Sequence, residues 1–319
     1  MSEPSGDVIE RDIVVPPECS GWRLDHFLKR RIGRMSRTRI QSIIGEQIAF
    51  PDGRPARPSS PVRAGETILL RRPAPIEPEV PRDFGILFED DSVLVIDKPA
   101  GLPMHTTAKF WRNTLVALLR ERYPDEPMEI AHRIDRETSG VLLIARTRAV
   151  ASILTRAFAR RAVEKTYLAL VKGQPPDAGR IDVPLRLLDT KSRVMMGPAR
   201  DGEPGLLTAS THYRVVRRLP GHALCEARPL TGRQHQIRVH LASIGHPIVG
   251  DKLYGAGEAL FMRACEEPLG PELLACFDGL ARHALHAHRL TFPHPVGKHP
   301  VTVESPLPAD LTTYIAGLA

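Results

Sequence analysis

The sequence has few cysteines and no long apolar run. Its 319 residues contain four cysteines, and no two of them form a CxxC pair. A chain of this length can build a core without a disulfide framework, so we expect Cys19, Cys225, Cys265 and Cys276 to be reduced thiols. No apolar stretch reaches the length of about 18 residues that a transmembrane helix requires, so we expect no membrane partner.

The chain also lacks the marks of a secretory signal. Its first residues, MSEPSGDVIERD, are polar and acidic, whereas a signal peptide begins with basic residues followed by an apolar stretch. We therefore expect the protein in the cytoplasm. No internal repeat is detectable.

The composition that is present is globular and basic. Hydrophobic residues make up 42% and charged residues 25%, the usual proportions of a folded protein. The net charge of +7 favours a polyanionic partner such as nucleic acid, because a positive field attracts phosphates. A basic enzyme with a small anionic substrate, or simply a soluble surface, has a similar charge.

The length and the prolines indicate two domains. At 319 residues the chain exceeds a single domain of roughly 100 to 200 residues, which favours a catalytic domain with a smaller module. Four prolines within residues 73–82 predict a semi-rigid spacer. We place one domain at 1–72, with its core at about 20–72, and the other at 83–319. Residues 190–207, rich in Gly, Pro and charge, are expected to be a loop.

The smaller domain is predicted to hold two short helices and a strand. Apolar residues recur at helical spacing from Leu24 to Ile32, and Ser36 is a candidate N-cap for a second helix that contains Ile40 and Ile44. The segment PVRAGETILLRRP supplies a turn and a strand. Between Arg23 and Arg39 there are seven basic residues and one acidic residue. The candidate RNA contacts there are Arg23, Lys29, Arg30, Arg34, Arg37 and Arg39, although a solvated basic helix face has the same pattern.

This domain resembles a small RNA-binding fold, the S-four-like domain first seen in a ribosomal protein. The matching segments are RLDHFL, MSRTRIQSII and VRAGETI, with IAFPDG where the family usually has a V.VNG turn. The resemblance implies a small α+β domain that binds RNA.

The larger domain has the pattern of an α+β fold. VLVID, VLLIA, VEKTYLALV, THYRVVRR and HALCEARPL are predicted strands. Asn113 and Thr147 are candidate N-caps of two helices, the second with Val150, Ile153 and Leu154 on one face. Residues 231–245 read as a loop leading into a helix that Gly245 ends.

The segment AHRIDRETSGVLLIA places Asp135 in a polar turn before an apolar strand. For an isolated Asp, a structural ion pair or a turn cap is the ordinary explanation. Here the whole string resembles the active-site motif of the RluA family of pseudouridine synthases, HRLD followed by TSG, with Ile134 in place of Leu. The resemblance continues through Phe158, Lys165 and Tyr167, through TGRQHQIRVHLASIGHPIVGDKLYG and through LHAHRLTFPHP, and covers most of residues 85–295.

The resemblance implies a mixed, largely antiparallel sheet flanked by helices and an enzyme that isomerises uridine in structured RNA after flipping the base. It assigns catalytic roles to Asp135, to Tyr167 as the ring under the target base, and to Arg238 as the cation that pairs with Asp135. Arg133 would fill the gap that the flipped base leaves. The substrate contacts expected around the site are His132, Arg133, Arg233, His235 and Gln236. Large-subunit ribosomal RNA is the leading substrate, transfer RNA remains open, and a monomer is favoured.

The chemistry suits these residues. The bond from ribose to the base nitrogen must break, the base must rotate, and the ribose must rejoin at carbon five, so neither a redox cofactor nor a metal is needed. An Asp with an ordinary pKa near 3.9 is charged at neutral pH, and an adjacent Arg lowers that pKa and offers a bidentate fork. Whether the carboxylate attacks the base, attacks the sugar or assists glycal formation stays open.

Two rival functions remain at the sequence level. A cluster of histidines suggests a hydrolytic metalloenzyme, although no acidic or Cys ligands accompany His283, His286, His288 and His294. A non-catalytic ribosome-assembly protein with this fold is the second rival, against which the intact Asp135, Tyr167 and Arg238 argue. The basic residues Arg148, Arg156, Arg160 and Arg161 fit RNA-backbone contacts or a solvated face equally well.

Overall fold

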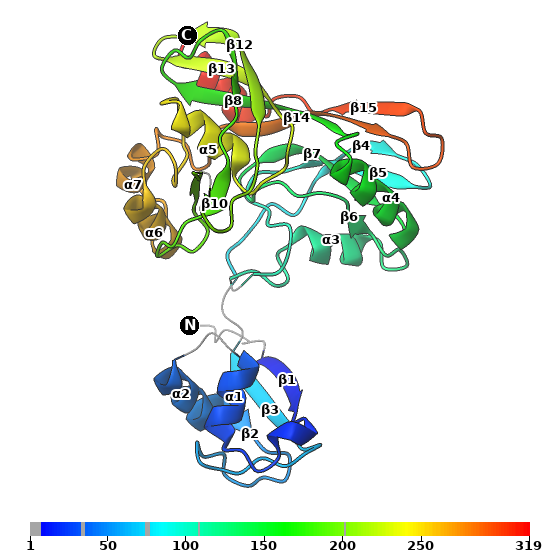
Figure 1. Ribbon diagram of the computed structural model, residues 1–319, viewed down its shortest axis with the longest axis vertical. Coiled ribbons are helices and arrows are strands. Elements are labelled where there is room, and N and C mark those ends of the chain that lie inside the picture. The colour runs from blue at the N-terminus through cyan, green and yellow to red at the C-terminus, as the bar shows by residue number, and fades with distance from the viewer. Residues whose placement is uncertain (1–7, 33–35, 74–76, 108, 201) are drawn as a thin grey trace, which may run out of the picture. The chain divides into compact units, whose positions relative to one another are not determined.

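A computed structural model describes residues 8–32, 36–73, 77–107, 109–200 and 202–319. The chain divides into two compact units, 1–76 and 77–319 (Figure 1). The larger unit begins within the segment 73–82 that the sequence predicts to be a spacer. The carboxylate of Glu77 accepts hydrogen bonds from the backbone amides of Arg112 and Asn113 at 2.6 and 2.7 Å, and Val80 packs against buried residues. The second half of the proline-rich segment is therefore part of the larger unit.

The smaller unit is a three-stranded antiparallel sheet packed against two helices. Its elements are β1 (Val8–Val14), a 3-10 turn (Pro17–Cys19), α1 (Leu24–Ile32), α2 (Arg37–Gln47), β2 (Ile48–Ala49) and β3 (Thr67–Pro73), with the strand order β1-β3-β2. The N-cap at Ser36 is confirmed, because its hydroxyl accepts from the amide of Arg39 at 3.2 Å. Strand β1 precedes the core expected at residues 20–72 and completes the sheet by pairing with β3.

The larger unit is built on one ten-stranded sheet (Figure 1). The strands of the main path run in the order β4-β5-β7-β14-β8-β13-β12-β9, with β15 on β14 and β6 on β7. Among the described strands of this sheet, β7 and β14 pair in parallel and every other pair is antiparallel, which confirms the expected mixed, largely antiparallel sheet. The strands are β4 (Gly85–Glu89), β5 (Val93–Lys98), β6 (Glu129–Ile130), β7 (Ser139–Ala145), β8 (Glu164–Lys172), β9 (Ala178–Ile181), β12 (Thr211–Leu219), β13 (His222–Pro229), β14 (Leu285–Pro293) and β15 (Pro300–Glu304).

Two of the sequence-based expectations for this unit are wrong in detail. The helix α3 (Leu115–Arg122) is capped by Thr114, whose hydroxyl accepts from the backbone amide of Ala117. The side chain of Asn113 instead donates from Nδ2 to the carbonyl of Pro78. The segment 190–207 is not simply a loop, because it contains β11 (Met196–Pro198), which pairs with β10 (Leu185–Leu187). The expected cap at Thr147 is confirmed at the start of α4 (Arg148–Ala159).

The remaining helices are α5 (Gln236–Ser243), α6 (Glu258–Glu266), α7 (Pro271–Ala275) and α8 (Ala309–Ala316). As expected, Ile237 and Leu241 of α5 and its C-cap residue Ile244 pack against the core, and the chain turns at Gly245 with φ of +83°. Ile153, expected on the buried face of α4, is exposed instead. Among the described residues no helix is long and apolar enough to span a membrane.

Candidate active site

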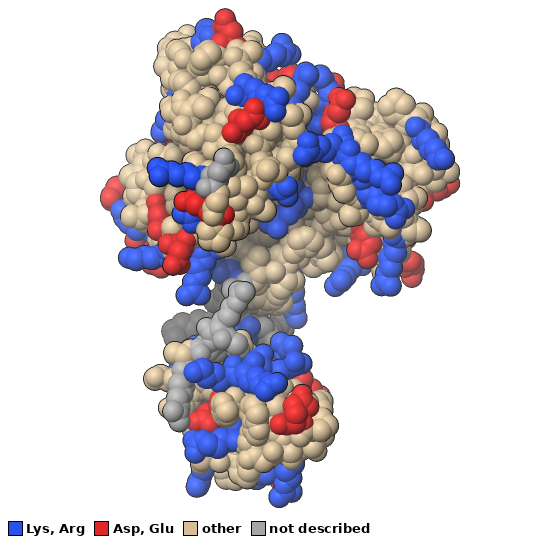
Figure 2. All heavy atoms as spheres, viewed as in Figure 1, with Lys and Arg blue, Asp and Glu red and all other residues tan. Residues whose placement is uncertain are grey.

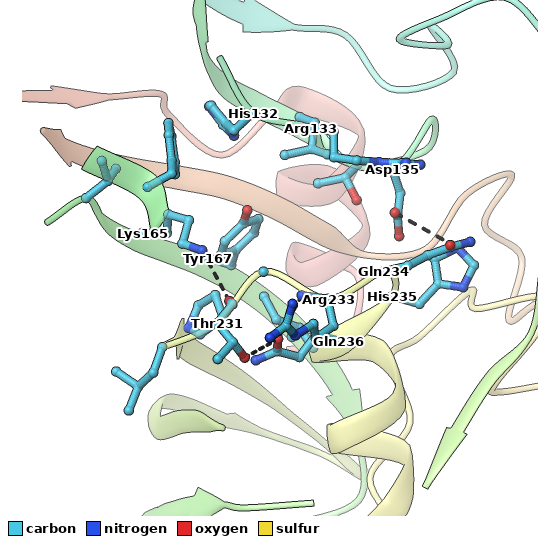
Figure 3. A pocket seen from close by; sticks show the side chains of 18 of the residues that line it. His132, Arg133, Asp135, Lys165, Tyr167, Thr231, Arg233, Gln234, His235 and Gln236 are labelled. Carbon is cyan, nitrogen blue, oxygen red and sulfur yellow. Dashed lines mark hydrogen bonds and ion pairs between the residues drawn. The ribbon is translucent and has the colours of Figure 1, made fainter. Parts of the chain in front are cut away.

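A cavity of about 650 Å³ opens in the larger unit where three segments meet. Its walls come mainly from the turn 131–138 before β7, from the end of α4 through the start of β8, and from the loop after β13 together with the first turn of α5 (Figure 3). Asp135, Tyr167 and Arg238, which lie far apart in the sequence, all line this cavity. The three residues that the sequence predicts to be catalytic are thus brought together.

The turn that carries Asp135 is held by contacts on both sides. The TSG sequence forms two hydrogen bonds of 2.9 Å. Thr138 pairs with His283, which precedes β14, and Ser139 pairs with His286, which lies on β14. Gly140 then passes so close to β14 that an added Cβ would lie 2.2 Å from the carbonyl oxygen of Ala287, and its φ is +108°. Only glycine fits both conditions. The TSG sequence therefore anchors the catalytic turn to the neighbouring strand.

The opposite side of the same turn is tied down by Lys98. Its buried Nζ donates to the carbonyl oxygens of Pro99, Leu102 and Arg136 at 2.7, 3.0 and 3.0 Å. The amide of Gly101 donates to the Arg136 carbonyl as well, at 2.8 Å. The backbone next to Asp135 thus has little freedom to move, which favours a precisely placed carboxylate.

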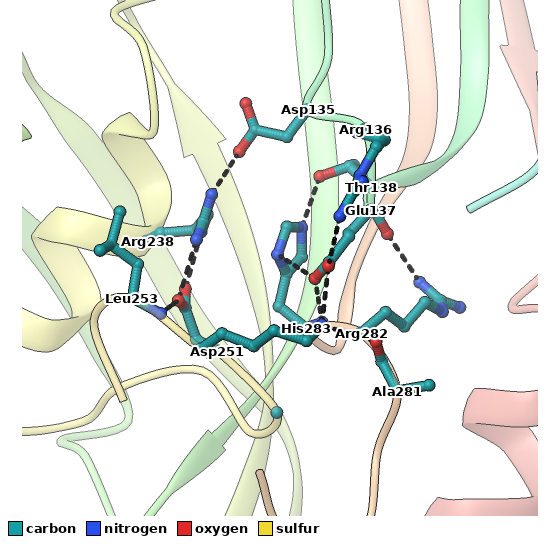
Figure 4. A network of polar contacts seen from close by, with 12 residues as sticks. Asp135, Arg136, Glu137, Thr138, Arg238, Asp251, Leu253, Ala281, Arg282 and His283 are labelled. Carbon is teal, nitrogen blue, oxygen red and sulfur yellow. Dashed lines mark hydrogen bonds and ion pairs between the residues drawn. The ribbon is translucent and has the colours of Figure 1, made fainter. Parts of the chain in front are cut away.

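Arg238 bridges two carboxylates (Figure 4). Its Nη1 donates to Oδ2 of Asp135 at 3.0 Å, while Nε and Nη2 donate to the two oxygens of Asp251 at 2.7 and 2.9 Å. The expected bidentate pairing with Asp135 is therefore wrong, because the fork faces Asp251 and Asp135 receives a single hydrogen bond. Oδ1 of Asp251 also accepts from the amides of Leu253 and Tyr254 at 3.0 Å, so Asp251 holds the guanidinium in place.

The local charges keep Asp135 ionised. Burial alone would raise its pKa, but the electrostatic interactions with His235, Arg238 and His283 and the hydrogen bond from Arg238 outweigh burial, and the pKa lies below its ordinary value. Burial lowers the pKa of both His235 and His283 to about 4, so these rings are neutral at pH 7. Arg238 is consequently the permanent charge that keeps this carboxylate negative.

Tyr167 provides the aromatic wall of the cavity. It lies on β8, where two of the hydrophobic clusters of the unit meet, and both pack against its ring. Burial, with a smaller contribution from the negative charge of Asp135, raises the pKa of the Tyr167 hydroxyl. The phenol is therefore protonated at neutral pH, close to an ionised carboxylate.

His235 stands between Asp135 and Tyr254. Its Nε2 lies 4.0 Å from Oδ1 of Asp135, and its Nδ1 is 2.8 Å from the hydroxyl of Tyr254. That hydroxyl accepts from the amide of Met196 at 2.9 Å, which leaves its own proton free for Nδ1. In the tautomer in which Nδ1 accepts this proton, Nε2 carries the imidazole proton and faces the carboxylate. His235 has φ of +56°, a strained value for a residue other than Gly and one that recurs at functional sites.

The other expected substrate contacts have different surroundings. Arg133 and Arg233 are exposed at the cavity wall, where they can reach a ligand. Gln236 is buried, and its amide binds Ser210, Thr211, Thr231 and the backbone of Arg233, so it shapes the loop instead of presenting free polar atoms.

His132 is likewise engaged inside the protein. Its Nε2 accepts from the amide of Leu143 at 3.1 Å, and burial lowers its pKa to about 3. Both His132 and Gln236 line the cavity, but their polar atoms support the walls. For these two residues the structure favours a supporting role over the expected substrate contact.

The basic residues expected to bind RNA lie largely on the surface. Arg148, Arg156, Arg160 and Arg161 are exposed on and after α4, and Figure 2 shows Lys and Arg side chains gathered over this part of the larger unit. In the smaller unit Arg23, Lys29, Arg30 and Arg39 are exposed, with Arg23 paired to Asp25 at 3.0 Å. Arg34 and the side chain of Arg37 lie outside the described residues.

The histidines near the C-terminal end serve different contacts. His283 pairs with Thr138, both His286 and His288 contact the carbonyl of Ser305, and His294 lies 2.8 Å from Asp90. Within the described part of the chain no group of three or more His, Cys, Asp or Glu is arranged to hold a metal ion.

Sequence reasoning missed Asp251 and Tyr254 as parts of the site. Both belong to the GDKLYG segment, which the family resemblance included without a role for either residue. The sequence signal that could have found them was weak, a carboxylate and an aromatic residue three positions apart within this segment. Asp251 holds the fork of Arg238, and the Tyr254 ring lies under the same guanidinium, 5.0 Å from its carbon to the ring centre.

Known proteins are similar to this chain in sequence and in fold. Residues 92–243 match the family described as RNA pseudouridylate synthase. A protein of Xanthomonas campestris named ribosomal large subunit pseudouridine synthase D is 37% identical over 328 aligned residues, which cover 100% of this chain and 96% of that protein. A Pseudomonas aeruginosa protein of the same name is 34% identical, with 95% and 94% covered.

Among solved structures, Human RNA Pseudouridylate Synthase Domain Containing 4 is 28% identical and superposes with a TM-score of 0.58, covering 73% of this chain and 92% of that chain. Human RNA Pseudouridylate Synthase Domain Containing 1 is also 28% identical, with a TM-score of 0.56 and coverage of 76% and 97%. Sequence, fold and the meeting of Asp135, Tyr167 and Arg238 in one cavity agree with the resemblance to the RluA family, and the chain belongs to the RNA pseudouridylate synthase family.

Proposed function

We propose that this pseudouridine synthase acts on large-subunit ribosomal RNA and that Asp135 is its catalytic carboxylate. The observation that carries the catalytic assignment is the hydrogen bond from Arg238 to Asp135 beside the Tyr167 ring, at the wall of a cavity large enough for one nucleotide. The ribosomal substrate rests on the names of full-length relatives.

The reaction begins with the target uridine outside its stack. A uridine in folded RNA hides its glycosidic bond, so the base must flip into the cavity, where it stacks on Tyr167. The exposed Arg133 next to the catalytic turn is placed to fill the space left in the RNA. Phosphates on either side of the flipped nucleotide meet the basic surface over α4 and the exposed Arg233.

In the bound state Asp135 faces the sugar and the base while remaining ionised. The bond between C1′ and N1 breaks, the uracil rotates within the closed site, and C1′ bonds to C5. The proton on C5 leaves and N1 gains one, so atoms and electrons balance without a cofactor. The carboxylate can attack C1′, attack the base or take a sugar proton. Tyr167 and the Nε2 proton of His235 are near enough to Asp135 to assist proton movement.

The test is to map new pseudouridines after incubating the protein with unmodified ribosomal RNA and, separately, with transfer RNA. We expect modification of large-subunit RNA by the wild type and none by Asp135→Asn. Modification of transfer RNA alone would overturn the ribosomal assignment, and modification by Asp135→Asn would overturn the catalytic one. We further propose, by resemblance to the family, that the enzyme is a monomer, and that it acts in the cytoplasm, where ribosomal RNA would be its substrate.

A further inference from the structure

Lys165 is a cation inside the cavity that the chemistry above does not use. It lies on β8 two residues before Tyr167, and both side chains project from the same face of the strand into the cavity. Its Nζ donates to the backbone carbonyl of Thr231 at 3.2 Å (Figure 3). Among the described residues no carboxylate forms an ion pair with it. An ammonium has three protons to donate, so the cavity holds a donor with capacity left.

The carbonyl of Thr231 also has capacity left. A carbonyl oxygen has two lone pairs, and among the described residues Lys165 is the only protein group that donates a hydrogen bond to this one. Donor and acceptor therefore stand side by side at the cavity wall. An added Cβ at the neighbouring Gly232 would contact the Lys165 ammonium at 3.5 Å, an ordinary van der Waals distance, so the glycine leaves this side of the ammonium uncovered.

A uracil stacked on Tyr167 presents a matching edge. In Figure 3, Tyr167 lies between the carboxylate of Asp135 and the amino group of Lys165. With the sugar bond at Asp135, the opposite edge of the ring carries O4, an acceptor, and N3–H, a donor. We propose that Lys165 and the Thr231 carbonyl form the recognition subsite for this edge, with the ammonium donating to O4 and the carbonyl accepting N3–H. The proposal rests on the pseudouridine synthase activity and adds its base-recognition subsite.

The same subsite serves both ends of the reaction. When the uracil rotates about the axis through N3 and C6, C5 replaces N1 at the sugar, O2 replaces O4, and N3–H keeps its place. Lys165 and Thr231 thus meet the pattern of acceptor and donor before and after rotation. Cytosine reverses this pattern, because its amino group would face the ammonium and its bare N3 would face the carbonyl, and a site built for hydrogen bonds rejects such a mismatch.

A backbone phosphate is the other anion that Lys165 could bind. The exposed Arg133, Arg161 and Arg233 also line the cavity and are free to meet phosphates from the solvent side. Lys165 is less exposed than these arginines, and its burial lowers its pKa to about 8, so the amino group is still mostly protonated at pH 7. The base edge, which is the part of the nucleotide that enters deepest, is the better match.

The experiment is a cycle of single-turnover rates with two enzymes and two substrates. The enzymes are the wild type and Lys165→Met, and the RNA is a short fragment around the mapped uridine. Its target base is either uracil or the analogue 4-thiouracil, which keeps N3–H but carries sulfur, a much weaker hydrogen-bond acceptor, in place of O4. We expect Lys165→Met to slow the uridine RNA about 10- to 100-fold, the effect of losing one charge-assisted hydrogen bond in a closed site. On the analogue the two enzymes should differ by less than about threefold.

Equal slowing of both substrates by Lys165→Met would overturn the proposal. So would a loss that vanishes when a neighbouring phosphate is made uncharged, which would assign Lys165 to the backbone. Lys172→Met is the matched control, because Lys172 lies on the same strand but pairs with Asp278 outside the cavity, and it should keep the wild-type rate on both RNAs. The cycle uses whichever RNA is found modified, so a transfer RNA target would overturn the ribosomal assignment without affecting this test.

Discussion

Arg238 binds Asp251 with two hydrogen bonds and Asp135 with one. The guanidinium is thus fixed by the buried Asp251 and only touches Asp135, which keeps oxygen lone pairs free for the substrate. A carboxylate locked in a full bidentate pair would be charged but poorly available. Because Arg238 is held by Asp251 and donates only one hydrogen bond to Asp135, the pKa of Asp135 stays low while its carboxylate remains accessible to the nucleotide.

Asp251→Asn should make Asp135 the sole counter-ion of Arg238. The amide retains the shape of Asp251 but not its charge, so Asp135 faces an undivided positive charge and its pKa falls further. We expect turnover to fall about 10- to 100-fold and the acidic limb of the pH–rate profile to move to lower pH. If the acidic limb of the pH–rate profile moved to higher pH instead, Arg238 would have lost its hydrogen bond to Asp135 in this variant.

Arg238→Lys should impair turnover more than folding. A lysine retains one charge near Asp251 but cannot span both carboxylates, so Asp135 loses its hydrogen bond and its pKa rises. The acidic limb of the profile then moves to higher pH, the opposite of the Asp251→Asn effect. We expect a rate loss of about 100-fold with a stability loss of about 1 to 2 kcal/mol by denaturant unfolding. Full activity would disprove the pairing role of Arg238.

Asp135→Asn should abolish isomerisation while RNA affinity stays within about threefold, since phosphate contacts supply most of the binding energy. Single-turnover product analysis measures the loss of isomerisation, and filter binding measures the RNA affinity.

The same variant tests how the stability of the protein depends on pH. Because folding lowers the pKa of Asp135, its ionisation stabilises the folded state above the unfolded pKa, and this stabilisation is lost as the pH falls through the folded pKa. Asp135→Asn should therefore lose less stability than the wild type on acidification.

Gly140→Ala should destabilise the larger unit by more than about 3 kcal/mol, because its Cβ would overlap the Ala287 carbonyl at 2.2 Å in a left-handed backbone conformation. Gly221, with φ of +67° and nothing within 4 Å, is the control, and Gly221→Ala should cost only about 1 kcal/mol. Thermal unfolding of both variants gives the comparison. If the two variants lost similar stability, the close contact of Gly140 on β7 with Ala287 on β14 would not require glycine.

Neutralising the exposed basic residues of α1 and α2 should weaken the salt dependence of RNA binding. Replacing Lys29, Arg30 and Arg39 with Gln should reduce the slope of log affinity against log salt by about 2, at about 0.7 for each lost phosphate contact. The control pair Arg57→Gln and Arg63→Gln, exposed in the same unit but outside these helices, should leave the slope nearly unchanged. If both sets of substitutions changed the slope equally, the smaller unit would attract RNA through its overall positive charge and not through a surface on these helices.

Much of this protein was predictable from the sequence because the relevant signals are local. Ser36 and Thr147 cap helices three residues from the amides that they bind, and alternating or continuous apolar residues mark the strands. The identity of Asp135 follows from a contiguous motif. Even the misplaced cap at Asn113 is one residue from the true cap, Thr114.

Only the tertiary structure decided which distant residues form hydrogen bonds with Arg238 and with Lys165. Asp135 and Arg238 are 103 positions apart, and Lys165 and the Thr231 carbonyl are 66 apart. No local periodicity encodes such pairs, because strand pairing and helix packing set them together with the burial that moves their pKa values. The sequence by itself determined the residue types and the elements that carry them, while the fold decided that Asp251 receives the fork and Asp135 the single hydrogen bond.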